Sequence, residues 1–282
     1  MEDFVLDHEL SIRLGFFVGI FAVVAVAELF APRRALRTAK LSRWVANIGI
    51  VIINTGVLRL VLPAGAVGLA AWTSQQGWGL FNYARFPYWL EVAISVIVLD
   101  FVVYLQHVMF HAVPTLWRLH MMHHADMDFD VTTGTRFHPL EILISMVIKA
   151  SAILVLGPPL VGVIAFEVLL NGLAMFNHGN LRLPLGLDKV LRWLVVTPDM
   201  HRVHHSVFPA EANSNFGFNL PWWDRLCGTY RDQPTHGHEG MTIGLKQFRD
   251  PARLTLFHIL IMPFVSPQGA YAINRRGTSG FD

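Results

Sequence analysis

Long apolar runs separated by short polar segments dominate the chain. The first run, residues 11–30, is long enough to cross a bilayer as a helix, because about 20 apolar residues cover the hydrocarbon core. It ends at Pro32, and a second run follows at about 45–71. A third run covers about 88–110. This pattern predicts about three membrane-spanning helices in the N-terminal part of the chain.

Two further apolar runs, about 142–156 and 160–176, are joined by a Gly-Pro-Pro sequence. Each run is short for a full span, and Gly and Pro favour a tight reversal of the chain. We therefore expect a helical hairpin that enters the bilayer and returns to the side from which it came. Lys149 and Glu167 lie inside this hairpin, where they could pair with each other or face the protein interior.

Weaker patterns predict the connecting elements. Residues 72–89 are expected to form a short outer loop with interfacial aromatic side chains. A helix over 185–196 is expected to lie on the membrane interface. The run 254–265 is too short to span and is expected to lie against the membrane or the hairpin. The tail from Ser266 is expected to be mobile.

The polar segments set the expected orientation of these helices. Five cations follow the first run closely: Arg33, Arg34, Arg37, Lys40 and Arg43. Because cytoplasmic loops of membrane proteins are enriched in Lys and Arg, this loop is expected inside the cell and the N-terminus outside. The polar segments 112–139 and 200–250 then also lie on the cytoplasmic side.

The composition agrees with a membrane protein. Only 15% of the residues are charged, against roughly 25% in soluble domains, and the mean hydropathy is +0.44. The formal net charge is +2 without a concentrated basic patch, which excludes a nucleic-acid partner. The predicted fold class is all-α, with polytopic membrane helices (about three spans plus a helical hairpin) and a cytosolic, histidine-rich helical cap.

Histidines gather beside these apolar runs. Eight of the fourteen histidines lie in three clusters: His107-x-x-x-His111, His120-x-x-His123-His124 and His201-x-x-His204-His205. Residues i, i+3 and i+4 share one face of a helix, so each cluster can present two imidazoles to one ion. Histidine binds transition metals and stays neutral near pH 7. Three such clusters on one face of the membrane predict a pocket for two metal ions.

Asp100 and Tyr104 extend the stripe of His107 and His111 deeper into the third run, at helical spacing. A charge at that depth is costly unless it is paired. We therefore expect Asp100 to accept the free N–H of a metal-binding histidine and so to fix the orientation of its ring.

The other histidines are weighed singly, because an isolated histidine is more often structural than a ligand. His178 directly follows the hairpin, on the expected cytoplasmic side, and is predicted to be a ninth ligand. His138 precedes Pro139 and is as compatible with a helix start or a supporting role as with metal binding. The remaining ones are expected to be structural: His8, His236, His238 and His258.

Spacing alone does not select the metal, since imidazole sites suit Zn, Fe, Cu and Ni. The single cysteine, Cys227, excludes an internal disulfide and a thiolate-rich zinc or iron–sulfur site. The chain has no HExxH sequence, which disfavours a zinc metalloprotease. Eight or nine ligands are also more than the four that a structural zinc ion needs.

Together, six patterns within residues 95–232 resemble those of the membrane fatty acid hydroxylase / sterol desaturase superfamily. The patterns are Asp100-x-x-x-Tyr104-x-x-His107-x-x-x-His111, Arg118-Leu119-His120-x-x-His123-His124, Arg136-x-His138-Pro139-x-Glu141, Asn177-His178-x-Asn180, Thr197-Pro198-x-x-His201-x-x-His204-His205 and Trp223-Asp224-Arg225-Leu226-Cys227-Gly228-Thr229-Tyr230. Each pattern is common by itself, but the combination is specific. The chain departs from relatives at Phe216, where they often have Tyr, and at Cys227, which replaces a common Phe.

The resemblance implies a non-haem di-iron centre that uses O2 to hydroxylate or desaturate a C–H site in a membrane lipid or sterol-like molecule. Zinc could replace iron in isolated protein. The implied ligands are His107, His111, His120, His123, His124, His178, His201, His204 and His205. Supporting positions near the metals are implied for Asp100, Tyr104, His138, Glu141 and Asn180. Residues 91–235 then form the catalytic domain, between N-terminal transmembrane helices (1–90) and a C-terminal interfacial segment and tail (236–282).

No pattern in the chain is typical of a flavin, nicotinamide, haem or iron–sulfur site. Since the reaction needs two electrons from outside, a separate ferredoxin- or cytochrome-type donor with its reductase is predicted. Cations that could steer an acidic donor, or contact anionic lipids, are Arg182, Lys189, Arg192, Arg202, Arg225 and Arg231. The expected location is a bacterial inner membrane with the site on the cytoplasmic side, although an endoplasmic-reticulum membrane also fits.

Two other functions are compatible with clustered histidines. A membrane metal-binding or metal-transport protein needs ligands along a route through the bilayer, but polar residues within the spans are few: Arg59, Asp100, Lys149 and Glu167. A scaffold that holds structural zinc is the weaker alternative, because it leaves most of the histidines without a role.

Overall fold

The computed structural model describes residues 2–84 and 86–274, and all regular secondary structure in these residues is helical. Five segments are long and apolar enough to cross a membrane: α2 (Glu9–Phe30), a run over 40–83 that begins with α3 (Lys40–Val61), α6 (Tyr88–Ala112), α8 (Pro139–Leu156) and α9 (Leu160–Asn177). The prediction of an all-α membrane protein is confirmed.

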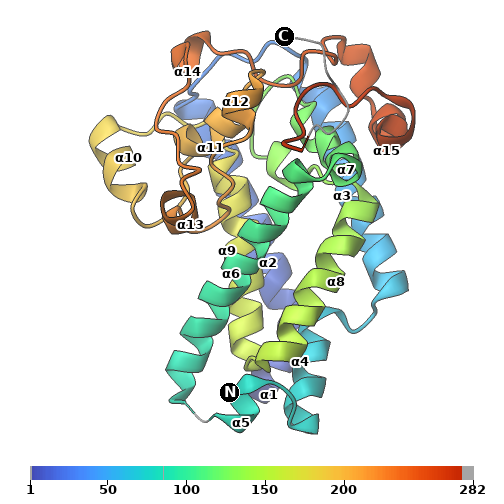
Figure 1. Ribbon diagram of the computed structural model, residues 1–282, viewed down its shortest axis with the longest axis vertical. Coiled ribbons are helices and arrows are strands. Elements are labelled where there is room, and N and C mark those ends of the chain that lie inside the picture. Colours follow the sequence, from blue (N-terminus) through green and yellow to red (C-terminus); the bar gives the residue numbers. More distant parts are fainter. Residues whose placement is uncertain (1, 85, 275–282) are drawn as a thin grey trace.

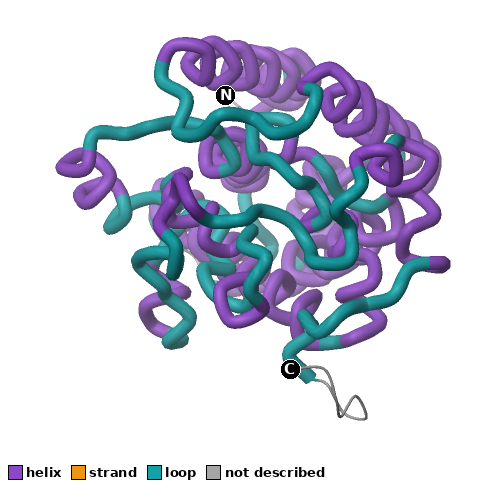
Figure 2. The backbone as a smooth tube through the Cα atoms, turned by 90° about the horizontal axis from the view of Figure 1, so that it is seen from above, coloured by secondary structure: helices purple, strands orange, loops and turns teal. Residues whose placement is uncertain are grey.

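The long helices form a bundle, and the shorter ones form a cap over one end of it (Figure 1). Within the bundle, α9 packs against α2 and α6, while α8 packs against α3 and α6. Seen along the bundle, the loops of the cap lie across its end (Figure 2). The cap contains α7 (Pro114–His124), η1 (Thr133–Thr135), α10 (Leu185–Leu191), α11 (Pro198–His204), α12 (Pro209–Ala212), α13 (Trp222–Leu226), α14 (Gly237–Gly240), η2 (Pro251–Leu254) and α15 (Leu256–Val265). The N-terminal helix α1 (Glu2–Asp7) lies at the opposite end.

The expected hairpin is present as α8 and α9, but its helices are longer than expected. Each has 18 residues, which is about 27 Å at 1.5 Å per residue and close to the thickness of the hydrocarbon core. The turn is made by Gly157, whose φ of 63° favours glycine. A Cβ on Gly157 would also collide with the carbonyl oxygen of Trp78, at the end of the bundle far from the cap. The hairpin therefore reaches across the bundle instead of entering it only partly.

The second apolar run consists of two helices instead of one. Helix α3 ends at Val61, just before Pro63, whose ring and missing N–H disrupt a helix. The chain then turns into α4 (Gly65–Gln76), which packs against α8 and α9. The expected outer loop is also partly helical, since α4 extends into it and α5 (Leu80–Tyr83) follows.

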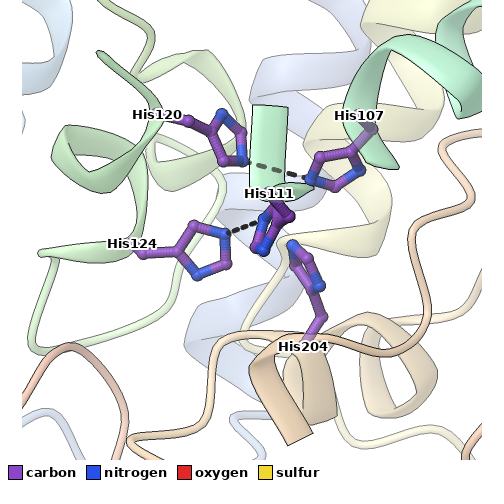
Figure 3. Close-up of side chains that lie close together, drawn as sticks. All are labelled: His107, His111, His120, His124 and His204. Atoms are coloured by element: carbon purple, nitrogen blue, oxygen red, sulfur yellow. Dashed lines mark hydrogen bonds between the residues drawn. The ribbon is translucent and has the colours of Figure 1, made fainter. Parts of the chain in front are cut away.

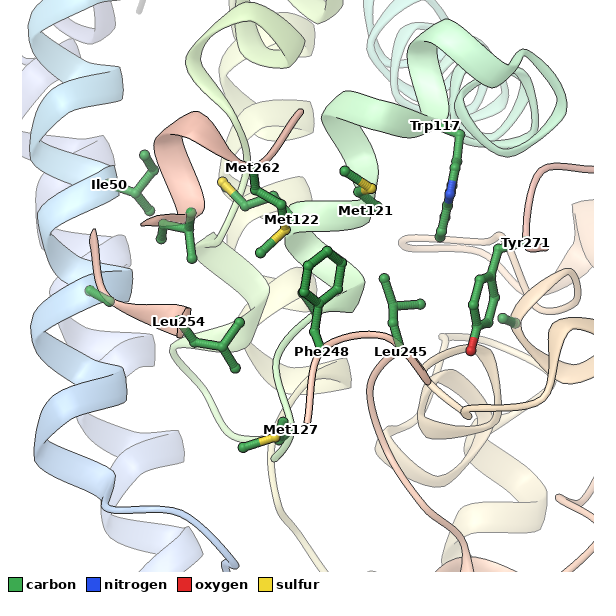
Figure 4. Close-up of a cluster of buried hydrophobic side chains, with 14 of the residues drawn as sticks. Ile50, Trp117, Met121, Met122, Met127, Leu245, Phe248, Leu254, Met262 and Tyr271 are labelled. Carbon is green, nitrogen blue, oxygen red and sulfur yellow. The ribbon is translucent and has the colours of Figure 1, made fainter. Parts of the chain in front are cut away.

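The cap has a hydrophobic core of its own, which fixes α7 (Figure 4). Three side chains of α7, namely Trp117, Met121 and Met122, are buried in it. They pack with residues from the C-terminal part of the chain: Leu245, Phe248, Leu254, Ile259, Met262, Tyr271 and Ala272. Packing against the C-terminal part of the chain thus fixes the position of helix α7, which carries three histidines.

The C-terminal segment belongs to this cap and is not the mobile tail that the sequence predicts from Ser266. The side chain of Tyr271 is 1% exposed, and the backbone N–H of Ile273 donates to the carbonyl oxygen of His111 at 2.9 Å. Helix α15 packs against α7 and α3. Residues 275–282 of the expected tail lie outside the described residues.

Helices α10 and α13 project from one side of the cap (Figure 1). The helix expected over 185–196 ends earlier, at Leu191. The exposed apolar residues of this projection are Leu185, Leu187, Val190, Trp193, Leu194 and Leu226. Trp and exposed aliphatic side chains are typical of the membrane interface, so we expect this projection to contact lipid.

Site-directed labelling tests this contact. In a Cys227→Ser background, Trp193→Cys labelled with a polarity-sensitive fluorophore is expected to report a low-polarity environment in lipid nanodiscs. Arg253→Cys is the control, because Arg253 is exposed on the cap. Equal quenching of both positions by a water-soluble quencher would contradict the assignment.

Candidate metal centre

Four separate segments bring histidines to the junction of bundle and cap. His107 and His111 lie one turn apart at the end of α6. The chain breaks at Val113, and Pro114 starts α7, which turns back so that its histidines face those of α6. His178 ends α9, and α11 is started by the side chain of Thr197, which accepts the Met200 N–H.

Nine histidines form two buried groups, and the potential ligand atoms within each group lie within 4.8 Å of one another. The first histidine group contains His107, His111, His120, His124 and His204 (Figure 3). The second histidine group contains His123, His178, His201 and His205. These are the nine histidines for which the sequence predicts metal binding. Adjacent histidines on one helix serve different groups: His123 and His124 are divided between them, as are His204 and His205.

Hydrogen bonds at Nδ1 orient six of these rings. The acceptors are oxygen atoms: Phe216 O for His107 (2.7 Å), Asn213 Oδ1 for His111 (3.0 Å), Glu141 Oε1 for His120 (2.6 Å), Arg136 O for His123 (3.2 Å), Ala174 O for His178 (2.7 Å) and Ser214 O for His204 (2.8 Å). Because these oxygens accept, Nδ1 carries the proton and Nε2 holds a lone pair.

The Nε2 atoms of these rings face each other at short range. The Nε2–Nε2 distance is 3.1 Å between His107 and His120, and 3.2 Å between His123 and His178. Since all four rings donate through Nδ1, neither pair has a proton to share, and the lone pairs point at one another. Among the described residues, the buried Nε2 of His204 has no hydrogen-bond partner either. Bringing lone pairs together in this way is favourable when a cation lies between them.

Protonation of the rings does not resolve these contacts. Burial is the largest cause that lowers the pKa of His123 and His204 well below its ordinary value, and neighbouring imidazoles lower it further. Burial also lowers the pKa of His178, to about 3. These three rings are therefore neutral at pH 7, which is the form that binds metal ions. The donor set fits two transition-metal ions held by nitrogen.

Of the predicted supporting residues, Glu141 contacts a histidine of the two groups, and Asp100 does not. The Asp100 carboxylate accepts hydrogen bonds from Trp223 Nε1 (2.8 Å) and the Leu220 N–H (3.3 Å). It therefore fastens the α13 segment to α6 instead of orienting a ligand. The hydroxyl of Tyr104 likewise bonds to Thr229 Oγ1 at 3.0 Å.

His138 and Asn180 also have structural partners. His138 caps α8: its Nδ1 accepts the Leu140 N–H at 3.2 Å, and its Nε2 donates to the Leu260 carbonyl oxygen. His138 belongs to neither histidine group. Of the roles that the sequence left open for it, the structure therefore favours the helix start. The side chain of Asn180 bonds to both the N–H and the carbonyl oxygen of Arg34 and so fixes the loop after α2.

A buried ionic network lies beside the second histidine group, and the sequence did not predict it. Arg43 pairs through two nitrogens with both oxygens of Asp126 (2.7 and 2.8 Å) and through a third with Asp130 (2.6 Å). Burial acts to raise the pKa of Asp126, but the charge and hydrogen bonds of Arg43 outweigh it and hold that pKa below its usual range. Asn47 continues the network to the guanidinium of Arg136 (3.1 Å). Because the Arg136 carbonyl orients His123, this network supports the second group.

A cavity of about 210 Å³ reaches the first histidine group from the membrane side. His107, His120 and Glu141 line one end of it. Apolar side chains form much of the remaining wall: Phe17, Val51, Leu58, Val103, Phe110, Phe137, Ile142, Leu170, Ala174 and Phe218. A long apolar chain therefore fits between the bundle helices with one part beside the histidines.

Comparison with known proteins agrees with this geometry. The chain is 25% identical over 224 residues to the ornithine lipid hydroxylase OlsE of Rhizobium tropici, covering 77% of this chain and 66% of that protein. It is 26% identical to the alkylglycerol monooxygenase of Xenopus tropicalis (77% of this chain, 48% of that protein) and 29% identical to that of Homo sapiens (57% and 35%). The chain thus spans less than two thirds of the length of these relatives. No solved structure matches it.

The family match covers the part of the chain that carries the site. Residues 92–229 match the fatty acid hydroxylase family, and both histidine groups lie within this range. Over residues 92–229, which carry both histidine groups, the chain is thus similar to the fatty acid hydroxylase family, and its relatives are by name a lipid hydroxylase and alkylglycerol monooxygenases.

Proposed function

We propose that this protein hydroxylates a C–H site of a membrane lipid with O2, and that its nine clustered histidines hold two iron ions. The observation that carries the proposal is the pair of histidine groups in which Nε2 lone pairs face each other. Iron bound there would supply the activation of O2 that acid–base side chains cannot provide. In the balanced reaction one oxygen atom enters the lipid and the other leaves as water, with two electrons and two protons consumed.

The residues of the chain contribute orientation and exclusion of water. The Nδ1 acceptors hold the imidazole rings, and Glu141 makes the His120 ring a stronger donor by accepting its N–H. Phe137 and Phe218 line the cavity beside His107 and His120. The substrate would enter from the bilayer and lie with its reacting carbon at that end of the cavity.

Relatives that act on ornithine lipids and alkylglycerols support a lipid as the substrate. Hydroxylation is favoured over desaturation because these relatives are by name a hydroxylase and a monooxygenase. A metal transporter is disfavoured, since both histidine groups lie together at one end of the bundle. Zinc is expected to replace iron in protein isolated without added iron.

The electrons are proposed to come from a separate ferredoxin- or cytochrome-type donor with its reductase, on the cytoplasmic side of a bacterial inner membrane. Arg192 and Arg202, which the sequence suggests as steering groups, are buried and paired with Asp188 and Asp199. Arg182 remains available, because more than half of its side chain is exposed. An acidic donor would dock on the cap, which is where the histidines lie closest to the polar end of the protein.

Isotope labelling tests the proposed reaction. Protein loaded with iron and supplied with reduced ferredoxin and total bacterial lipid is expected to produce a lipid that gains one oxygen atom derived from labelled dioxygen. Mass spectrometry identifies the product, and a zinc-loaded sample is the control. Loss of two hydrogens without oxygen gain would instead assign desaturation, and oxygen gain from labelled water would contradict the proposal.

Glu141→Gln is expected to weaken metal binding in the first histidine group by roughly 10- to 100-fold, as found for residues that orient metal ligands. The amide lacks the negative charge that strengthens the His120 hydrogen bond. Titration of metal content against a chelator measures this change. Glu239→Gln is the control, since Glu239 lies on the surface and contacts only arginines. Equal metal retention in both variants would contradict the role assigned to Glu141.

A further inference from the structure

A second cavity, of about 410 Å³, adjoins the one beside the histidines. The two cavities share Phe17, Val51, Thr55, Leu58 and Asn171 as lining residues. The second cavity continues toward the end of the bundle that is far from the cap, because its walls include the start of α2 and the end of α3. The shared walls place the two cavities next to each other, in a line from His107 and His120 toward the far end of the bundle, and we call this line the path.

Charged side chains line the far part of this path, among otherwise apolar helices. Glu167 is 3% exposed and pairs with Lys149 at 2.6 Å and with Arg13 at 3.1 Å. Arg13 also pairs with Glu9. Charges inside a membrane span are costly, and they are usually retained where they pair or serve a ligand. In this set two acids balance two bases.

Arg59 takes no part in these ion pairs. It lies in the last turn of α3, where it is exposed, and it lines the same cavity. Within the described residues, no hydrogen bond or ion pair of its side chain is found. An unpaired guanidinium at the wall of a cavity between membrane helices is a binding group for an anion, since it offers several donors in a planar fork.

We propose that Arg59 binds the acidic head, carboxylate or phosphate, of a single-chain amphiphile whose apolar chain follows the path to the histidines. The inference rests on the proposed function, because it names the class of molecule that the site would oxidise. The distance sets the chain length. Glu167 and His178 are 11 residues apart on α9, which is about 16 Å at 1.5 Å per residue. An extended chain of C–C bonds advances roughly 1.25 Å per carbon, so about 13 carbons fill this distance.

A purely structural role explains the other charges but not Arg59. Arg13, Lys149 and Glu167 lie on α2, α8 and α9, and their ion pairs connect these three helices. Arg59 connects nothing in the described part of the chain. Substitution of Arg59 therefore separates ligand binding from the stability of the bundle.

Binding measurements without turnover test the proposal. The iron-loaded protein is placed in phosphatidylcholine nanodiscs under argon, and the binding of radiolabelled palmitate, hexadecyl phosphate and methyl palmitate is compared. We expect one of the two acids to bind more tightly than the uncharged ester, and the tighter acid identifies the head group. Arg59→Leu is expected to weaken the binding of that acid roughly tenfold, the effect of losing a charge-assisted hydrogen bond, and to leave the ester unchanged.

Further variants complete the test. Arg59→Lys is expected to retain most of the acid binding. Arg253→Leu, which makes the Arg→Leu change on the cap surface, is expected to retain all of it. His204→Ala is expected to lose turnover but keep acid binding, so that failure of the proposed reaction and failure of this inference are distinguished. Two results would overturn the inference. One is that the acids bind no more tightly than the ester, and the other is that Arg59→Leu weakens the binding of acid and ester equally.

Discussion

Replacing His204 by alanine is expected to reduce lipid oxidation to less than roughly one hundredth of the wild-type rate, because a lost ligand costs more than the 10- to 100-fold of a residue that only orients one. The ring is fully buried in the first histidine group, and its Nε2 has no other partner. The same loss is expected for His201→Ala in the second group. Product formation is measured by mass spectrometry with a saturating electron donor.

The control for this prediction is His258→Ala, since His258 is exposed on α15 and bonds only to Thr255. Its rate is expected to stay near the wild-type value. Membrane insertion of all three variants is expected to be normal, because the apolar helices that drive it are unchanged. A His204→Ala variant that keeps most of the wild-type rate would show that the first group is not the reactive centre.

Replacing Arg43 by leucine is expected to lower the free energy of unfolding by about 3–5 kcal/mol, the usual cost of removing one partner from a buried ion pair. The change leaves the buried carboxylates of Asp126 and Asp130 without their cation. It also disturbs Asp126, which is linked through Asn47 to Arg136. Because the Arg136 carbonyl oxygen holds His123, the second group is expected to lose metal first. Thermal unfolding in detergent micelles and metal content measure the two effects.

A charge-preserving variant sharpens the second prediction. Arg43→Lys keeps the positive charge but cannot make the two parallel bonds to Asp126, so an intermediate loss is expected. Arg253→Leu serves as the control for a surface arginine. If Arg43→Leu unfolds at the wild-type temperature and retains its metal, the network has no structural role.

Much of the fold could be predicted, because the thickness of the bilayer sets the length of an apolar run. This length does not depend on which residues pack against one another. The run over 11–30 is thus close to α2, and that over 88–110 is close to α6. Local chemistry explains the errors. Pro63 divides the second run, and the His138 cap and Pro139 start the first hairpin helix before residue 142, where the apolar run begins.

The nine histidines and a pocket for two metal ions could be predicted, but the membership of the two groups could not. It depends on how α7 and α11 face each other, which no spacing within one helix contains. The partner of Asp100 shows the same limit. Seven residues separate Asp100 from His107, about 10 Å along the helix, which is too far for a hydrogen bond. Glu141 takes that role because α8 returns the chain to His120. The sequence predicts Arg43 as one cation of a cytoplasmic loop, because the carboxylates with which it pairs come much later in the chain.

Metal stoichiometry is the most direct test of the central claim that two separate sets of imidazoles each hold one ion. Protein purified in active form is analysed for iron and zinc by mass spectrometry and compared with His204→Ala and His201→Ala. We expect about two metal ions per chain in the wild type and a loss of one ion, from a different group, in each variant. Full activity with one metal ion or none per chain would contradict the account.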